Sequence, residues 1–364
     1  MKIGIITIQN SSNYGAMLQT YALQSFLEKY GCSVEIINYD NPHMAKGLDL
    51  IRHGTSLIEI YYMILDLLNF RARKKMIHNF HIFSRDYLNL TRKYSKSELL
   101  YGMLETYDIY ISGSDQIWNP NVTDGEVDDI YFCGMAQKGS KVISYASSFG
   151  GYDFLDKNKN EKIKNFLKKY SAISTREMGY IQKASCLTEK RIVKVMDPVF
   201  LLSKDEWYNS MNTQEIIGKP YILIYVMSKH AEVLERVLRM NISKNLDIIM
   251  FGETLIRKKN IHYVMDAGPK EFVNFFRNAS FVVTNSFHGT AFSLIFNKNM
   301  CVLNNANNMN RIYDLLQTVN LNSILVKDIN ALEMSNQVDY NAVNQYLKVL
   351  IDKSKKYLIE EVNI

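Results

Sequence analysis

Short apolar stretches rich in β-branched residues recur along the chain, and small polar residues follow each of them at once. The first stretch, residues 2–8, leads into the polar run QNSSN and then into apolar residues at helical spacing that stop at Gly31. A second stretch follows at 33–39. Buried parallel strands read as continuous apolar runs, and strand, helix and strand at this spacing form a βαβ unit. We therefore predict an α/β fold built on parallel sheets.

The same alternation continues through both halves of the chain. Further strands are predicted at 109–112, 142–146, 172–175, 192–195, 221–226, 247–251, 281–284 and 300–303. Further helices are predicted at 160–170, 231–240, 270–278, 289–295, 312–319 and 340–362. This order indicates two doubly wound, Rossmann-like domains that face each other across a cleft, the glycosyltransferase-B architecture.

A length of 364 residues suits two such domains. The predicted N-terminal domain covers 1–205 and carries a helical insertion near 51–105. The predicted C-terminal domain covers 219–340, after a connection at 207–218, and a last helix covers 341–364.

Composition narrows the class of partner. The net charge of +6, from 43 basic and 37 acidic residues, is mild and suits a small anion or an anionic membrane face better than nucleic acid. The four cysteines, Cys32, Cys133, Cys186 and Cys301, are scattered, which indicates reduced thiols rather than a metal site. With no signal peptide and no apolar run of membrane-spanning length, the chain is predicted to be cytoplasmic.

In open parallel sheets, ligands bind beyond the carboxyl ends of the strands. The loop after the first strand contains Ser12, Asn13, Tyr14 and Gly15 and opens onto a helix, whose N-terminus favours an anion. These four residues are predicted to bind a donor. The alternative is ordinary helix capping by Ser12 or Asn13.

Two further strand ends carry hydrogen-bonding side chains suited to sugar hydroxyls. The candidates for acceptor binding are Ser114, Asp115, Gln116, Trp118, Ser147 and Ser148. The alternative is a tight turn in which Trp118 packs in the core.

Arg176 follows the strand at 172–175 and has a planar fork suited to a carboxylate or phosphate. The alternative is a surface pair with Glu177 or an interdomain salt bridge.

The most specific segment is VVTNSFHGT, at 282–290, in which a buried strand runs into His288 at the start of a helix. Imidazole suits proton transfer near neutral pH, so His288 is a catalytic candidate, and its neighbours Ser286, Phe287, Gly289 and Thr290 are candidates for donor binding. A purely structural histidine is the alternative.

At these residues the sequence resembles the polysaccharide pyruvyl transferase family. The segments that carry the resemblance, in the family's order, are GIITIQNSSNYGAMLQTYAL, DIYISGSDQIWNP, SYASSFG, ISTRE, MDPVFLL and VVTNSFHGTAFSLIF. Six ordered motifs are far more specific than any one of them.

The resemblance implies transfer of pyruvate from phosphoenolpyruvate onto two hydroxyls of one sugar, with formation of a cyclic ketal and release of phosphate. We expect no cofactor, and no metal either, because the proposed site has one nearby histidine, no paired cysteines and no DxD-like carboxylate cluster at a strand end. The resemblance also implies that His288 supplies or relays a proton and that Arg176 binds the donor. Some members carry arginine where this chain has Ser286, so Lys229 and Arg311 are candidates for the second cation.

Two other functions are consistent with the same architecture: a nucleotide-sugar glycosyltransferase and a non-catalytic binding protein. The expected acceptor is a lipid-linked oligosaccharide. The sequence does not identify the acceptor sugar, its hydroxyl pair, the ketal stereochemistry or the oligomeric state.

Residues 51–83 combine apolar side chains at helical spacing with a basic cluster. The apolar residues are Leu57, Ile60, Tyr61, Ile64, Leu65 and Leu68, and the bases are Arg71, Arg73, Lys74 and Lys75. This pattern is typical of a helix at an anionic membrane surface. The alternative is a helix that packs on the first domain and leaves a solvated basic end.

Overall fold

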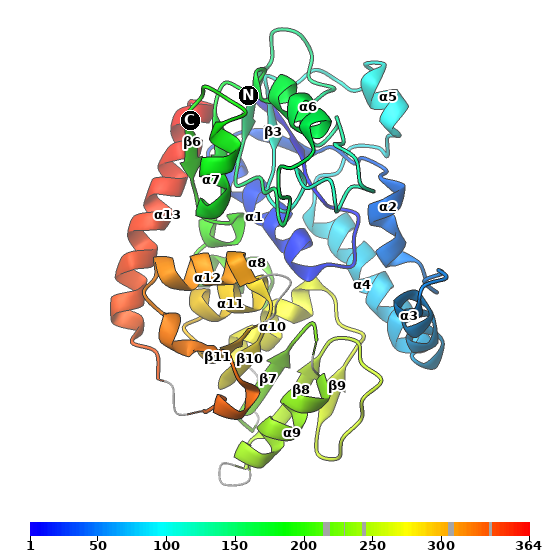
Figure 1. The fold of residues 1–364 in the computed structure, drawn as a ribbon, viewed down its shortest axis with the longest axis vertical. Helices are drawn as coiled ribbons and strands as arrows, with labels where there is room; N and C mark the ends of the chain where they lie inside the picture. Colours follow the sequence, from blue (N-terminus) through cyan, green and yellow to red (C-terminus); the bar gives the residue numbers. More distant parts are fainter. Residues whose placement is uncertain (214–218, 229, 242–244, 305–308, 335–336) are drawn as a thin grey trace. The chain divides into compact units, whose positions relative to one another are not determined.

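The computed structural model describes residues 1–213, 219–228, 230–241, 245–304, 309–334 and 337–364 (Figure 1). The chain divides into two compact units. The first unit comprises Met1–Asp49, His81–Leu202 and Lys348–Ile364, and the second comprises Leu50–Phe80 and Ser203–Leu347.

The predicted domain boundaries need two corrections. The insertion expected in the N-terminal domain is divided, because Leu50–Phe80 groups with the second unit, where Arg52 and Arg73 pair with Glu253. The last helix is divided as well. Its end, from Lys348 onward, groups with the first unit because side chains such as Leu358 pack against that unit's core.

The first unit contains a four-stranded parallel sheet of order β2-β1-β3-β4. Its strands are β1 Lys2–Ile6, β2 Ser33–Ile36, β3 Ile109–Ser112 and β4 Lys141–Ser144. A second parallel pair, β5 Ile173–Thr175 and β6 Ile192–Lys194, continues beside β4 through the bridges Ile143↔Ala172 and Ser147↔Thr175. All these strands therefore end at the same edge.

Helices cover both faces of this sheet. Wholly within the first unit are α1 Tyr14–Lys29, α2 Pro42–Ala45, α5 Lys96–Leu100, α6 Lys157–Leu167, α7 Met178–Ser185 and the 3-10 turns Lys46–Leu48 and Pro198–Leu201. The helices α4 Phe70–Tyr87 and α13 Tyr340–Val362 end in this unit. On one face, α1 and the end of α13 pack against Ile3, Ile5 and Ile111.

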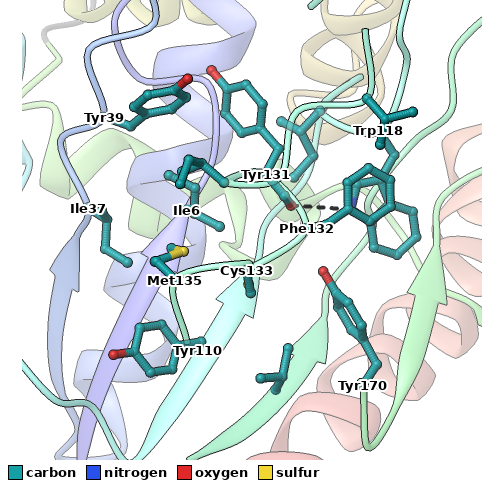
Figure 2. Packing of buried hydrophobic residues seen from close by; sticks show 14 of the residues in the cluster. Ile6, Ile37, Tyr39, Tyr110, Trp118, Tyr131, Phe132, Cys133, Met135 and Tyr170 are labelled. Atoms are coloured by element: carbon teal, nitrogen blue, oxygen red, sulfur yellow. Dashed lines mark hydrogen bonds between the residues drawn. The ribbon is translucent and has the colours of Figure 1, made fainter. Parts of the chain in front are cut away.

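The opposite face holds an aromatic core around Trp118 (Figure 2). The indole of Trp118 stacks on Phe132 with ring centroids 5.2 Å apart, and Tyr170 meets it edge-on at 5.6 Å. Its Nε1 donates to Ser112 Oγ at 3.0 Å and to Tyr131 O at 3.3 Å. Burial of aromatic area with the polar N–H satisfied stabilises this layer strongly.

The second unit contains a six-stranded parallel sheet of order β12-β11-β10-β7-β8-β9. Its strands are β7 Tyr221–Tyr225, β8 Asp247–Phe251, β9 His262–Val264, β10 Phe281–Thr284, β11 Asn299–Leu303 and β12 Leu325–Val326. Every pairing between these neighbours is parallel.

This sheet is also covered on both faces. Its helices and 3-10 turns are α3 Leu57–Leu68, α8 Lys204–Ser210, α9 His230–Asn241, α10 Pro269–Asn278, α11 Phe287–Ile295, α12 Met309–Thr318, Asn322–Ile324 and Ile329–Ala331. Residues of α9 pack against Ile222 and Ile224 on one face. On the other, Tyr225 meets Phe272 of α10 edge-on at 5.1 Å. The two sheets confirm the predicted α/β architecture with doubly wound, Rossmann-like units.

The connection predicted at 207–218 needs correction in its first part. Ser203 and Glu206 form a capping box that starts α8, and Trp207 is buried edge-on against Phe292 at 5.1 Å. The helix therefore exists because its one large apolar residue has a core position to fill. Residues 214–218 lie outside the described part.

The four cysteines are free thiols, and Cys32, Cys133 and Cys301 are buried whereas Cys186 is exposed. Across the described ranges, no helix combines the length and apolar character that crossing a bilayer requires.

Candidate functional site

The loops that follow β1, β3, β4 and β5 lie at the carboxyl edge of the sheet in the first unit. Close to the ends of β3 and β4, Asp115 with φ 73° and Ala146 with φ 55° adopt the left-handed conformation that non-glycine residues rarely take. Such strain persists only where the surroundings hold it, and it gathers at functional sites.

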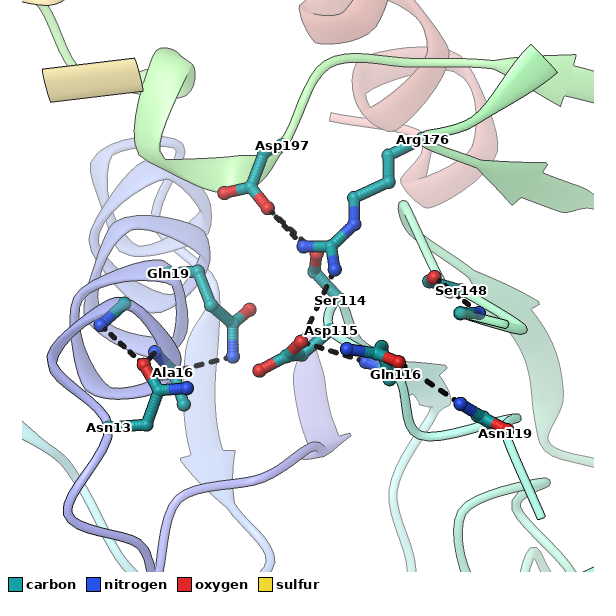
Figure 3. A network of polar contacts seen from close by, with 12 residues as sticks. Asn13, Ala16, Gln19, Ser114, Asp115, Gln116, Asn119, Ser148, Arg176 and Asp197 are labelled. Carbon is teal, nitrogen blue, oxygen red and sulfur yellow. Dashed lines mark hydrogen bonds and ion pairs between the residues drawn. The ribbon is translucent and has the colours of Figure 1, made fainter. Parts of the chain in front are cut away.

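Arg176, just after β5, is the centre of a buried polar network at this edge (Figure 3). Its Nε donates to Glu177 Oε1 at 2.9 Å, and its Nη1 donates to Asp197 Oδ2 at 2.7 Å. Its Nη2 donates to Asp115 Oδ1 at 3.2 Å. Arg176 thus joins its own loop to those that follow β3 and β6.

The three carboxylates stabilise the charged form of Arg176. Burial opposes the charge of the guanidinium, but the carboxylates of Glu177, Asp115 and Asp197 outweigh it and raise the pKa of Arg176 above its usual value. The Nε, Nη1 and Nη2 groups of Arg176 each donate to one of these carboxylates. The geometry therefore favours the ion-pair alternative for Arg176. The pairs are buried and lie within the first unit, so they are neither surface pairs nor an interdomain salt bridge.

Two predicted acceptor residues extend the same network. Ser114 Oγ donates to Asp197 Oδ2 at 3.3 Å, and Ser148 Oγ donates to Glu177 Oε1 at 2.7 Å. The structure thus brings Ser114, Asp115 and Ser148 together around the Arg176 network.

The side chains of the other predicted acceptor residues have other partners, although Gln116 N donates to Asp115 Oδ1 at 2.9 Å. Ser147 Oγ donates to the carbonyls of Ser112 and Gly113, both at 2.9 Å. Trp118 is buried in the core, which is the alternative to acceptor binding that the sequence allowed for this residue. Gln116 is partly exposed, and its Oε1 accepts from Asn119 Nδ2 at 3.0 Å. Contact with an acceptor stays a prediction for all of these side chains.

The loop after β1 caps α1. Asn13 Oδ1 accepts from the amides of Gly15 at 2.9 Å and Ala16 at 3.3 Å, which is the capping alternative, with Asn13 rather than Ser12 as the cap. Tyr14 and Gly15 are buried. Donor binding by this loop stays a prediction.

The same loop region is tied to the β3 loop through a short chain of hydrogen bonds. Gln19 Nε2 donates to Thr7 Oγ1 at 2.9 Å, and Thr7 Oγ1 donates to Ser114 O at 2.9 Å. Figure 3 shows Gln19 and Asn13 on the α1 side of the Asp115 loop.

In the second unit, His288 lies in the first turn of α11, directly after β10. Its side chain is buried, and its ring centroid lies 5.2 Å from that of Phe287, at 88°. Ser286 caps the helix by accepting from Gly289 N at 3.4 Å, and Thr290 Oγ1 donates to Ser286 O at 3.0 Å. This arrangement presents an imidazole at the positive end of a helix dipole, as the sequence predicted.

Gly289 allows α11 to approach β10 closely. A Cβ at this position would lie 2.3 Å from Thr284 Oγ1 and 3.1 Å from Tyr225 Cδ1. Thr284 Oγ1 is itself engaged, since it donates to Tyr225 O at 2.7 Å and accepts from Ser286 N at 3.1 Å. The glycine therefore sets the position of His288 relative to the strand.

One of the two candidate cations lies near this motif. The Arg311 guanidinium, in the first turn of α12, is 5.9 Å from the centroid of the Phe287 ring. The other candidate, Lys229, lies outside the described residues.

Sequence reasoning missed three residues at these edges. Asp197 follows β6 in the MDPVFLL segment, and its only sequence signal was that position after a strand. Asn285 accepts from Met227 N at 2.7 Å and joins the ends of β7 and β10. His230 interacts through Nε2 with Val226 O at 2.9 Å, and burial lowers its pKa.

The comparisons with known proteins bear on this arrangement. The family described as polysaccharide pyruvyl transferase matches residues 13–307, which contain His288 and all three carboxylates around Arg176. The chain belongs to the polysaccharide pyruvyl transferase family. No curated protein sequence matches it.

Solved structures show the same fold at low identity. The UDP-GlcNAc 2-epimerase of Methanocaldococcus jannaschii has a TM-score of 0.51 at 12% identity, and the match covers 100% of this chain and 99% of that one. The UDP-GlcNAc 2-epimerase of Neisseria meningitidis, bound to UDP-GlcNAc, has a TM-score of 0.51 at 10% identity with the same coverage. These likenesses support the glycosyltransferase-B type of α/β fold for this member of the family.

The Arg176 network predicts a large loss of stability when the guanidinium is removed. Arg176→Met leaves three buried carboxylates without their shared partner and should lower the free energy of unfolding by about 3–5 kcal/mol. Urea denaturation followed by circular dichroism measures this loss. The matched control is Arg191→Met at an exposed arginine of the same unit, which should cost no more than about 0.5 kcal/mol. Equal stability of the two variants would contradict the network's structural role.

The close approach at Gly289 predicts coupling with Thr284. Gly289→Ala should destabilise the protein by about 1–3 kcal/mol, because its Cβ overlaps Thr284 Oγ1. In the double variant with Thr284→Ala, part of that cost should disappear, giving a coupling energy of roughly 0.5 kcal/mol or more in a double-mutant cycle. If the free-energy costs of Gly289→Ala and Thr284→Ala simply add in the double variant, contact with Thr284 Oγ1 is not the reason that position 289 requires glycine.

Proposed function

We propose that this protein transfers the pyruvyl group of phosphoenolpyruvate to two hydroxyls of one sugar in a polysaccharide precursor, forming a cyclic ketal and releasing phosphate. The observation that carries the proposal is the family match over residues 13–307, together with His288 at the start of α11. Phosphoenolpyruvate is a substrate, and the proposed reaction uses no resident cofactor.

The proposed reaction balances with two hydroxyl protons. The donor methylene gains a proton and becomes a methyl group, which makes the adjacent carbon electrophilic. One sugar hydroxyl bonds to that carbon, the carbon–oxygen bond to phosphate breaks, and the second hydroxyl closes the ketal. The two sugar hydroxyls lose two protons in total. One proton is accounted for by the hydrogen added to the methylene, and the other leaves with phosphate.

The second unit carries groups suited to the donor. The N-terminus of α11 favours an anion, and the Arg311 guanidinium lies near the adjacent Phe287. His288, in the same turn, is the group we assign to proton delivery onto the donor methylene, because imidazole exchanges protons near neutral pH. Arg311 is our candidate for the cation that other members supply from the position of Ser286.

The first unit carries groups suited to the acceptor. Three carboxylates surround Arg176, and carboxylates accept hydrogen bonds from sugar hydroxyls and can take their protons. We assign acceptor activation to Asp115, whose loop also presents Gln116. Arg176 is then a positioning residue that holds the Asp115 carboxylate, in place of the donor contact expected from the sequence.

The acceptor class follows from the family. Its description names a polysaccharide, and such polymers are assembled from sugars on lipid carriers, so we propose a lipid-linked oligosaccharide. A screen of soluble glycosides for acceptor-dependent release of phosphate from phosphoenolpyruvate would identify the sugar.

The test of the catalytic assignment is substitution of His288. With an acceptor found in that screen, His288→Gln should reduce phosphate release by about two to four orders of magnitude, because proton delivery is lost while the fold is kept. The matched control is His262→Gln, at an exposed histidine of the same unit, which should keep the wild-type rate.

Two outcomes would count against the proposal. A near-wild-type rate for folded His288→Gln would return this histidine to a structural role. Transfer of a sugar from a nucleotide sugar, with no reaction of phosphoenolpyruvate, would replace the proposed donor.

A further inference from the structure

Helix α3 exposes an unusual number of large apolar side chains. Leu57 is 89% exposed, Leu68 71%, Ile58 63% and Leu67 54%. Scattered exposed apolar residues are ordinary, but a contiguous patch of this kind marks an interaction site. Within this helix, only Leu65 and Asp66 are buried.

Most of the exposed side chains share one side of the helix. At 100° per residue, six of the eight exposed large residues of α3 fall within an arc of about 120°. These six are Leu57, Ile60, Tyr61, Ile64, Leu67 and Leu68, whereas Ile58 and Tyr62 lie outside the arc. We call these six residues the α3 apolar arc. Asp66 lies on the opposite side, so the helix turns the Asp66 carboxylate inward and the α3 apolar arc outward.

A buried ion-pair cluster holds α3 in this orientation. Asp66 Oδ1 lies 2.5 Å from Arg52 Nη2 and 3.2 Å from Arg73 Nε. Both arginines also reach Glu253, Arg52 through Nη2 and Arg73 through Nη1, each at 2.8 Å. Two cations and two anions balance, and turning the helix to bury its apolar arc would separate the buried Asp66 carboxylate from both arginines.

The predicted basic patch after α3 needs correction, because two of its four bases are engaged in ion pairs. Of the four bases after α3, Arg73 is buried in the cluster, and Lys75 pairs with Asp266 at 2.6 Å. Arg71 and Lys74 are exposed at the start of α4. Charge therefore contributes less to any surface binding than the sequence indicated, and apolar area contributes more.

Charge placement favours an anionic lipid surface as the occupant of the arc. Glu59, the other acid of α3, lies away from the arc, and its Oε2 accepts from Ser56 N at 2.9 Å. The bases Arg71 and Lys74 follow the helix directly, and Tyr61 and Tyr62 supply the amphipathic rings common at membrane interfaces.

A second copy of the chain suits the arc less well. A helix of 12 residues is about 18 Å long, and a stable interface buries about 800 Å² on each partner. One such helix paired with its copy along a single stripe would leave the rest of the arc in water. A bilayer interface surrounds the whole arc instead.

We propose that the α3 apolar arc inserts into the interfacial layer of a phospholipid membrane, with Arg71 and Lys74 contacting anionic headgroups. This inference does not depend on the proposed reaction, because it concerns where the protein lies and not what it transforms. It would hold the protein at the surface where lipid-linked molecules are found.

The experiment is co-sedimentation of the full chain with two kinds of vesicle: pure phosphatidylcholine, and equal parts of phosphatidylcholine and phosphatidylglycerol. The wild type should bind both and bind the mixed vesicles more tightly. The triple variant Leu57→Ser, Leu67→Ser, Leu68→Ser should lose roughly tenfold or more of its partition into both. Since these side chains are exposed, the variant should fold normally, which circular dichroism checks.

Two further variants separate the contributions. Arg71→Gln with Lys74→Gln should weaken binding to the mixed vesicles alone, by less than the triple variant does. Leu155→Ser with Val349→Ser, at exposed apolar residues outside α3, should bind as the wild type does.

Three results would overturn the proposal. Wild-type protein could stay in the supernatant with both vesicles, or the triple variant could bind as well as the wild type. The third is a concentration-dependent dimer in sedimentation velocity that the triple variant loses, without vesicle binding, which would assign the arc to a second copy.

Discussion

The guanidinium of Arg176, enclosed by the carboxylates of Glu177, Asp115 and Asp197, ties together the loops after β3, β5 and β6. Burying four charges is costly, so the loops keep this shape only while every partner is present. The left-handed backbone at Asp115 depends on the same restraint. In our account, this cluster places the carboxylate that would meet the acceptor hydroxyls.

Each unit carries groups to which the proposed reaction assigns a role. In the second unit, these are the N-terminus of α11, the His288 imidazole and Arg311. In the first unit, they are the buried carboxylates that Arg176 holds. Donor binding by Arg176 stays a prediction from the sequence.

Much of the fold could be predicted from the sequence because buried parallel strands are continuous apolar runs. The strands at 109–112, 247–251 and 281–284 were predicted within their observed bounds. The edge strands β9 and β12, of three and two residues, are too short to produce such a pattern. His288 was predictable since it directly follows a buried strand. Partners that lie 21 and 61 residues from Arg176 have no local signal, and neither does the pairing of Arg73 with Glu253.

The account depends on pyruvyl transfer with proton delivery to the donor methylene, and a reaction run in heavy water tests this most directly. Mass spectrometry and proton NMR of the acceptor glycoside should show a new ketal whose methyl group carries a single deuterium. An acceptor recovered without a pyruvyl group, or with a ketal methyl free of deuterium, would contradict the proposed chemistry.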